Sequence, residues 1–181
     1  MRRIGFLSNL IPEKGLDTVI DVFRALHREF GQLALVIAGP ATEQSARRLI
    51  DSATQEFAGA VDYRGPIYGS AKDAFYRDVD VFLFPTRYPN EAQPLVVLEA
   101  LAAGVPVIAT ARGCIAEDLI TGGIVVLPEM NFVHAAVLAI SGWLGDPARM
   151  KHLSTTALNR ANELHSASRH ELAQLIRRMA A

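Results

Sequence analysis

The sequence predicts an α/β protein with a Rossmann-like, doubly wound parallel sheet of about six strands. Short apolar runs alternate along the chain with longer segments whose apolar residues recur at helical spacing. The run at 33–38, LALVIA, is continuously apolar, which is typical of a strand buried on both faces of a parallel sheet. The chain has 181 residues, of which 50% are hydrophobic and 20% charged, a composition and length that suit one globular domain.

Six short runs are predicted to be the strands of this sheet. The second is closed by Gly39-Pro40 and the fourth by Pro85, both strong chain-turning signals. The strands are expected at 4–7, 33–38, 61–63, 79–84, 105–109 and 124–127.

Eight segments between and after these runs are predicted to be helices. Pro12 stands where the first helix would begin, Thr42 is a candidate cap for the second, and Asp146-Pro147 gives the seventh a cap and a first-turn proline. Gly104 follows the fourth helix and is expected to end it. The helices are expected at 12–30, 42–57, 70–77, 94–103, 115–120, 132–144, 147–164 and 168–179.

Composition and charge exclude several classes of protein. The formal net charge is −1, so no overall field attracts nucleic acid, and we expect no nucleic-acid partner. A single cysteine, Cys114, excludes a disulfide framework and fits a reducing compartment. No apolar run reaches the roughly 18–20 residues that span a bilayer. We therefore expect a cytoplasmic protein, either free or peripheral at the inner membrane.

The loops that follow strands should carry the chemistry, because parallel sheets bind ligands at the carboxyl ends of their strands. Neither G-x-G-x-x-G nor G-x-x-x-x-G-K-[ST] occurs there, which disfavours a dinucleotide dehydrogenase and a P-loop enzyme. The first loop instead reads SNLIPEKG. Its Lys14 either reaches an anion at a helix N-terminus or is a solvated surface lysine.

The segment 90–106, NEAQPLVVLEALAAGVP, places Glu91 before a predicted helix and Glu99 about one turn inside it. Pro94 has no N–H, but Leu95 and Val96 offer free first-turn amides and the helix dipole to an anion. A carboxylate accepts hydrogen bonds from a vicinal diol, so glutamates on either side of a phosphate site suit a nucleoside diphosphate sugar. On spacing alone, the alternative is that both glutamates face solvent.

This segment resembles the donor-binding motif of family-4 (group 1) glycosyltransferases of the GT-B fold. Residues 8–15 (SNLIPEKG) are similar to the family's G-R-L-x-x-x-K-G loop, and residues 35–40 (LVIAGP) to its second strand and glycine turn. Residues 81–110 (VFLFPTRYPNEAQPLVVLEALAAGVPVIAT) carry the specific part, with the proline, the paired glutamates and the A-x-G-x-P-V-I-A-T ending.

The resemblance implies roles for individual residues. Glu91 would contact the transferred sugar as the catalytic-site carboxylate, and Glu99 would bind the ribose hydroxyls. Lys14 and the amides of Leu95 and Val96 would bind the diphosphate. The remaining residues that the resemblance implies for donor binding are Asn9, Gly39, Arg64 and Ile67 of the loop 64–68 near the nucleobase, Gln93 and Pro94.

Two departures from the family pattern stand out. The family's diphosphate-binding arginine aligns with Asn9, which removes one cation, and Arg87 and Arg112 are candidates to compensate. The family's Phe-Gly before the helix is Gln93-Pro94 here.

The resemblance covers only one of the two domains of a GT-B enzyme. We expect residues 1–165 to form the nucleotide-sugar-binding domain and 166–181 a helix that packs toward an N-terminal acceptor domain absent from this chain. The resemblance implies a retaining hexosyltransferase of polysaccharide or glycoconjugate biosynthesis, with a UDP- or GDP-sugar donor and a sugar, glycan or glycolipid acceptor. No obligatory cofactor or metal is implied, and the single domain should be weakly active or inactive.

Other functions remain open from the sequence. A non-catalytic nucleotide-sugar-binding subunit that needs a partner acceptor domain would suit Asn9 and the short chain. A GT-B epimerase or phosphorylase is a further alternative, although the sequence offers no recognisable pyridoxal lysine for a phosphorylase.

Overall fold

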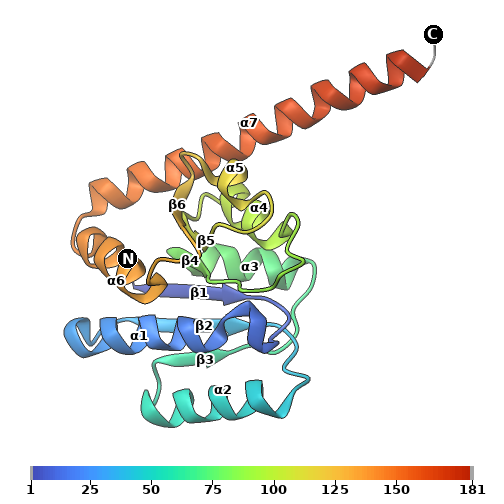
Figure 1. Cartoon of the computed structure of the whole chain (residues 1–181). Helices are drawn as coiled ribbons and strands as arrows, with labels where there is room; N and C mark the ends of the chain where they lie inside the picture. Colours follow the sequence, from blue (N-terminus) through green and yellow to red (C-terminus); the bar gives the residue numbers. More distant parts are fainter. Residues whose placement is uncertain (1, 180–181) are drawn as a thin grey trace.

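The computed structural model describes residues 2–179 and contains one parallel sheet flanked by helices (Figure 1). The strand order is β3-β2-β1-β4-β5-β6, and every neighbouring pair is parallel. The strands are β1 (Arg3–Leu7), β2 (Ala34–Ala38), β3 (Val61–Tyr63), β4 (Val81–Phe84), β5 (Val107–Thr110) and β6 (Gly123–Val126). The predicted fold class and six strands are confirmed.

Helices cover the sheet on both faces, as expected for a parallel sheet whose strands are connected through helices. The helical elements are the 3₁₀ turn η1 (Pro12–Lys14), α1 (Leu16–Phe30), α2 (Gln44–Glu56), α3 (Ser70–Asp78), α4 (Leu95–Ala102), α5 (Ile115–Leu119), α6 (Phe132–Trp143) and α7 (Pro147–Met179). Helix α1 packs against α2 and α6, whereas α7 packs against α4 and α5.

The core lies between the central strands and these helices. Strands β4 and β5 are buried at every position, as expected for parallel strands covered on both faces. Helix α1 buries Leu16, Val19, Ile20, Phe23 and other apolar residues at helical spacing. The strand order reverses between β1 and β4, which pair with each other through Ile4 and Gly5, so the sheet has its topological switch point there.

The predicted helix at 12–30 is wrong in one respect, because it divides at Gly15. This residue has φ 81°, and a Cβ on it would lie 2.4 Å from the carbonyl oxygen of Pro85. A side chain is therefore excluded where the first loop meets the end of β4. Residues Pro12–Lys14 form a separate 3₁₀ turn before α1 begins at Leu16.

The prediction of Thr42 as a helix cap is also wrong. Helix α2 begins at Gln44, with Glu43 in the cap position and extended backbone. By contrast, the predicted cap at Asp146 is confirmed, because its carboxylate accepts the N–H of Arg149 at 2.9 Å.

The two predicted C-terminal helices form one continuous helix, α7, of 33 residues. Neither glycine nor proline follows Pro147, so Ser166-Ala167-Ser168 remain helical rather than ending the helix. The first part of α7 packs on the core through Met150, Leu153, Ala157, Ala161 and Leu164. The rest projects beyond the other elements toward the C-terminus (Figure 1). Within residues 2–179, no helix is both long and apolar enough to cross a membrane.

Candidate functional site

The loops after β1, β2 and β4 surround a cavity of about 280 Å³ at the switch point of the sheet. The structure brings Asn9 and Lys14 of the first loop together there with Gly39 and Glu91, which belong to two other loops. Its full lining is Leu7, Ser8, Asn9, Lys14, Gly39, Pro40, Ile67, Tyr68, Lys72, Phe84, Glu91, Pro94, Leu95 and Val96.

Gly39 allows the first two of these loops to touch. Its φ is 124°, and a Cβ on it would lie 1.8 Å from the carbonyl oxygen of Ser8. The loops are also joined by a hydrogen bond from the Leu10 N–H to the Pro40 carbonyl, at 3.1 Å. Only glycine permits this approach, so Gly39 shapes the cavity through the backbone.

Lys14 and Glu91 form the first charged pair of the site. Lys14 Nζ donates to Glu91 Oε2 at 2.6 Å, and the hydroxyl of the buried Thr86 donates to the same oxygen at 2.8 Å. The ammonium also lies over the rings of Phe84 and Tyr88, 5.6 and 4.7 Å from their centroids. The Lys14 and Glu91 side chains are only 14% and 8% exposed. Lys14 is therefore not a solvated surface lysine.

Lys72 and Glu99 form the second pair, on α3 and α4. Lys72 Nζ donates to Glu99 Oε1 at 2.7 Å, while the Tyr76 hydroxyl lies 2.9 Å from Glu99 Oε2 and 3.1 Å from the Val96 carbonyl oxygen. Burial, with the neighbouring Glu99 carboxylate, raises the pKa of the Tyr76 hydroxyl far above its ordinary value. Tyr76 therefore stays a protonated hydrogen-bond donor in the folded protein.

The two pairs lie on either side of the N-terminus of α4. Pro94 is in the cap position with φ −73° and ψ 111°, and no side chain of the described residues caps the helix. The Val97 N–H bonds back to the Pro94 carbonyl at 3.0 Å, whereas no protein acceptor within residues 2–179 is recorded for the N–H groups of Leu95 and Val96. Both residues line the cavity, so the helix N-terminus can bind an anion through its backbone.

The segment that carries Glu91 is held from behind by the loop after β5. A Cβ on Gly113 would lie 2.0 Å from the Ala92 carbonyl oxygen, and that oxygen accepts the N–H of Cys114 at 2.7 Å. Gln93 Nε2 lies 3.2 Å from the carboxylate of Asp118, which is 4% exposed. Gln93 thus anchors the loop and is not among the residues that line the cavity, so its role in donor binding stays a prediction.

Glu99 lies next to the cavity rather than in its lining. It borders an adjoining hollow of about 660 Å³, between α3 and α4, which shares Tyr68 and Lys72 with the first cavity. A ligand that extends from one hollow into the other would pass between Lys72 and Tyr68.

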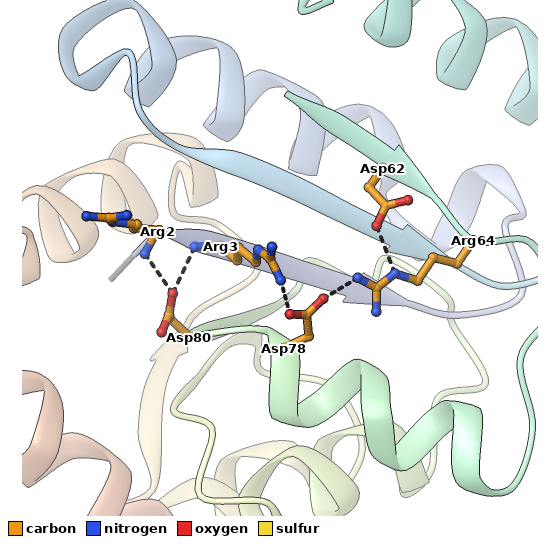
Figure 2. Close-up of polar contacts among 6 residues, drawn as sticks. All are labelled: Arg2, Arg3, Asp62, Arg64, Asp78 and Asp80. Atoms are coloured by element: carbon orange, nitrogen blue, oxygen red, sulfur yellow. Dashed lines mark hydrogen bonds and ion pairs between the residues drawn. The ribbon is translucent and has the colours of Figure 1, made fainter. Parts of the chain in front are cut away.

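Arg64 is not among the residues that line the cavity, and its predicted place near the nucleobase stays a prediction. Figure 2 shows its guanidinium between Asp62 and Asp78, with Nε 2.9 Å from Asp62 Oδ2. Asp78 also pairs with Arg3, and Asp80 accepts the backbone N–H groups of Arg2 and Arg3. This network ties the ends of β3 and α3 to β1. Ile67, from the same predicted loop, does line the cavity.

The candidate replacements for the missing arginine do not line the cavity either. Arg87 binds Asp17, Thr18 and the Pro12 carbonyl on the α1 side of the loop. Arg112 follows β5, and its Nε is buried without a recorded partner among the described residues. Sequence reasoning missed Lys72 and Tyr76, although their four-residue spacing on a predicted helix places both on one face.

Comparison with known protein families shows to which family the chain belongs. The family described as "Glycosyl transferases group 1" matches residues 2–160. The chain belongs to the group 1 glycosyltransferases. The resemblance found in the sequence is therefore confirmed.

Two curated relatives are mannosyltransferases from bacteria. The chain is 33% identical over 150 residues to a GDP-mannose-dependent alpha-(1-6)-phosphatidylinositol monomannoside mannosyltransferase of Mycolicibacterium smegmatis. It is 30% identical over 171 residues to the lipopolysaccharide core biosynthesis mannosyltransferase LpsB of Rhizobium meliloti. These matches cover 79% and 88% of this chain but 38% and 46% of the relatives. The chain thus spans less than half the length of either relative.

Solved structures of group 1 glycosyltransferases and their relatives share the fold. A sucrose-phosphate synthase from Thermosynechococcus elongatus superposes with a TM-score of 0.77 at 27% identity, over 98% of this chain and 45% of that one. The C-terminal domain of the group 1 protein LpcC from Francisella tularensis gives a TM-score of 0.74 at 19% identity, over 90% and 85% of the two chains. The second likeness shows the fold alone.

Proposed function

We propose that this chain is the donor-binding domain of a glycosyltransferase that transfers a hexose from a GDP- or UDP-sugar to a sugar, glycan or glycolipid acceptor. The observation that carries the proposal is the pair of lysine–glutamate contacts on either side of the uncapped N-terminus of α4. This arrangement offers cations and amides to a diphosphate and carboxylates to the sugar hydroxyls flanking it.

Each residue has a place in this mechanism. Lys14 and the amides of Leu95 and Val96 bind the diphosphate and stabilise its charge as the glycosidic bond breaks. Glu91 accepts hydrogen bonds from the transferred sugar, and Glu99 from the ribose. We expect the transfer to retain the anomeric configuration, as the family resemblance implies. We also expect no requirement for a metal ion, because Lys14 and the helix amides can hold the leaving diphosphate.

The acceptor is bound by an N-terminal domain that precedes this one in the complete enzyme. The short span of the chain relative to its relatives supports this view. So does the distal part of α7, where Leu172, Leu175, Ile176 and Met179 are exposed at i, i+3, i+4 and i+7. We infer that residues 166–179 pack against that domain and that residues 2–165 make up the donor domain. Residues 1, 180 and 181 of the predicted segments 1–165 and 166–181 lie outside the described residues.

The nucleotide is tested by calorimetric titration of the chain with GDP, UDP and ADP, and then with the corresponding sugar conjugates. GDP-mannose is the first conjugate to test, because one mannosyltransferase relative is named as GDP-mannose-dependent. We expect saturable binding of one nucleotide series. Glu99→Gln should lower the affinity for the nucleoside and for its diphosphate alike by roughly tenfold, because both ligands lose the same ribose contact.

The control for this titration is Glu129→Gln, which removes a carboxylate that is exposed. It should bind nucleotide like the unaltered chain. The proposal fails if no nucleotide binds at millimolar concentration, or if Glu99→Gln binds as tightly as the control.

A second candidate function is a nucleotide-sugar-binding subunit without catalysis. The observation that favours it is Asn9, an uncharged side chain in the cavity lining. An Asn9→Arg variant should bind nucleoside diphosphates more tightly under either function. Transfer measured after adding a separate acceptor domain decides between them, because only a catalytic donor domain yields product.

A further inference from the structure

We propose that Lys72 is the second cation that binds the donor diphosphate, in partnership with Lys14. This inference rests on the proposed function, because it names a further residue of the same nucleotide-sugar site. No sequence motif assigned Lys72 a role.

The distribution of lysines in the chain is the first argument. The chain has only three lysines, at positions 14, 72 and 151. Two of them, on different elements, reach the same cavity of about 280 Å³. Among the lining residues that the structure describes, they are the cations, because Arg64, Arg87 and Arg112 lie outside the lining.

Geometry is the second argument. Lys72 Nζ lies 2.7 Å from Glu99, which is one helical turn after the open amide of Leu95, or about 6 Å along the axis of α4. The flexible four-carbon stem of a lysine spans such a distance by rotation. Lys14 lines the same cavity as these amides and pairs with Glu91, which precedes the helix, whereas Glu99 lies within it. A diphosphate on these amides therefore lies between the two ammonium groups.

Charge balance is the third argument. In the structure each lysine is neutralised by one glutamate, so the four side chains carry no net charge. A multiply charged diphosphate needs compensation when it enters a partly buried site. When the sugar and ribose hydroxyls occupy Glu91 and Glu99, both lysines become available to the phosphates. Lys72 thus changes its partner from Glu99 to phosphate when the donor binds.

Lys72 could either bind the diphosphate or only hold Glu99 in place, and these two roles predict different effects on ligand binding. A cation for the diphosphate matters to ligands that carry phosphate and not to the bare nucleoside. A side chain that only positions Glu99 matters equally to both, because the ribose contact is common to them.

The test is calorimetric titration of the full chain and its variants with GDP and guanosine, and with UDP and uridine. Lys72→Met should weaken binding of the preferred diphosphate by roughly tenfold or more, while binding of the matching nucleoside changes less than about threefold. Lys72→Arg should stay within a few-fold of the unaltered chain, because the charge is kept. Lys151→Met, on the exposed face of α7, is the matched control and should change neither affinity.

Salt gives a second readout. Binding of the diphosphate should weaken less steeply with added salt in Lys72→Met than in the unaltered chain, because one screened contact is missing. Equal losses for nucleoside and diphosphate, or an unchanged diphosphate affinity, would overturn the role of Lys72 and leave the proposed function intact. Failure of the unaltered chain to bind any nucleotide would overturn both.

Discussion

Lys14 Nζ lies 2.6 Å from Glu91 Oε2, so the cation of the first loop and the carboxylate before α4 neutralise each other. They are separated by 77 positions in the sequence and are brought together at the ends of neighbouring strands. Because both side chains are largely buried, the pair is also structural. Removing one partner leaves a poorly solvated charge.

We expect Lys14→Met to destabilise the fold by about 1–3 kcal/mol, because only Thr86 then compensates the Glu91 carboxylate. Chemical denaturation at neutral pH measures the change. A double variant, Lys14→Met with Glu91→Gln, should regain part of the loss, since it leaves no unpaired charge. Lys151→Met is the control, and an equal unfolding midpoint for Lys14→Met and this control would contradict the prediction.

The protonated Tyr76 hydroxyl predicts a loss of stability in alkali. The pKa of this group is raised in the folded state above its ordinary value of 10.0, so the folded protein retains a proton that the unfolded chain loses. The free energy of unfolding should be unaffected below about pH 9 and fall by about 1.4 kcal/mol per pH unit once the pH exceeds 10.

Denaturant unfolding between pH 8 and 11 measures this slope. Tyr76→Phe should flatten it and lower stability at neutral pH by about 1 kcal/mol, because the bond to Glu99 is lost. Tyr68→Phe, which alters an exposed side chain, should keep the slope of the unaltered chain. Identical slopes in all three proteins would show that another group controls alkaline stability.

We expect the addition of a single methyl group at Gly39 to destabilise the fold severely. Gly39→Ala places a Cβ 1.8 Å from the Ser8 carbonyl oxygen, at a φ that L-residues rarely adopt. We expect a loss of about 2–4 kcal/mol and weaker nucleotide binding, because the two loops of the cavity must separate.

The matched change is Gly142→Ala, in α6, where an added Cβ meets nothing within 4 Å. It should stabilise the protein by up to about 1 kcal/mol, in line with helix propensity. Thermal unfolding of both variants gives the comparison. A Gly39→Ala protein as stable as Gly142→Ala would refute the close approach of the loops.

We expect the two parts of α7 to contribute unequally to the stability of the fold. A variant ending at His165 keeps the buried Ala157 and the Arg160 contacts to the Glu117 and Asp118 carbonyls. Its free energy of unfolding should lie within about 0.5 kcal/mol of the full chain, because the removed part contributes little to the core. It should also self-associate less, because exposed apolar residues are gone.

A variant ending at Thr156 is the contrast. It loses the packing of Ala157, Ala161 and Leu164 and should be destabilised by roughly 3 kcal/mol or more. If the two truncations lost equal stability, the prediction that the domain ends near residue 165 would be wrong.

Much of this protein could be predicted from its sequence, because the patterns involved are local. Apolar runs closed by Gly39-Pro40 and Pro85 located the second and fourth strands, and the alternation with helices gave a parallel sheet. The spacing of Glu91 and Glu99 around a predicted helix start, and the place of Lys14 at the start of a helix after a strand, made these residues candidates. The family resemblance then gave each of them a specific role. The amides of Leu95 and Val96 followed from the geometry of any helix N-terminus.

Other features depended on how the elements meet in space. The division of the first helix at Gly15 follows from contact with Pro85, which lies on another loop. The partner of each charged side chain could not be predicted either, because the sequence pattern around an arginine or lysine does not show which acidic group it will contact. Arg64 and Gln93 contact Asp62, Asp78 and Asp118 and are not among the residues that line the cavity.

The sequence by itself therefore determined the order of the strands along the chain, their burial and the position of a helix start with free backbone amides. Those properties follow from periodicity, turn residues and backbone hydrogen bonding within short segments. The tertiary structure alone decided which charges share the cavity, because ion pairs such as Lys14–Glu91 and Lys72–Glu99 join elements that only the folded sheet brings together.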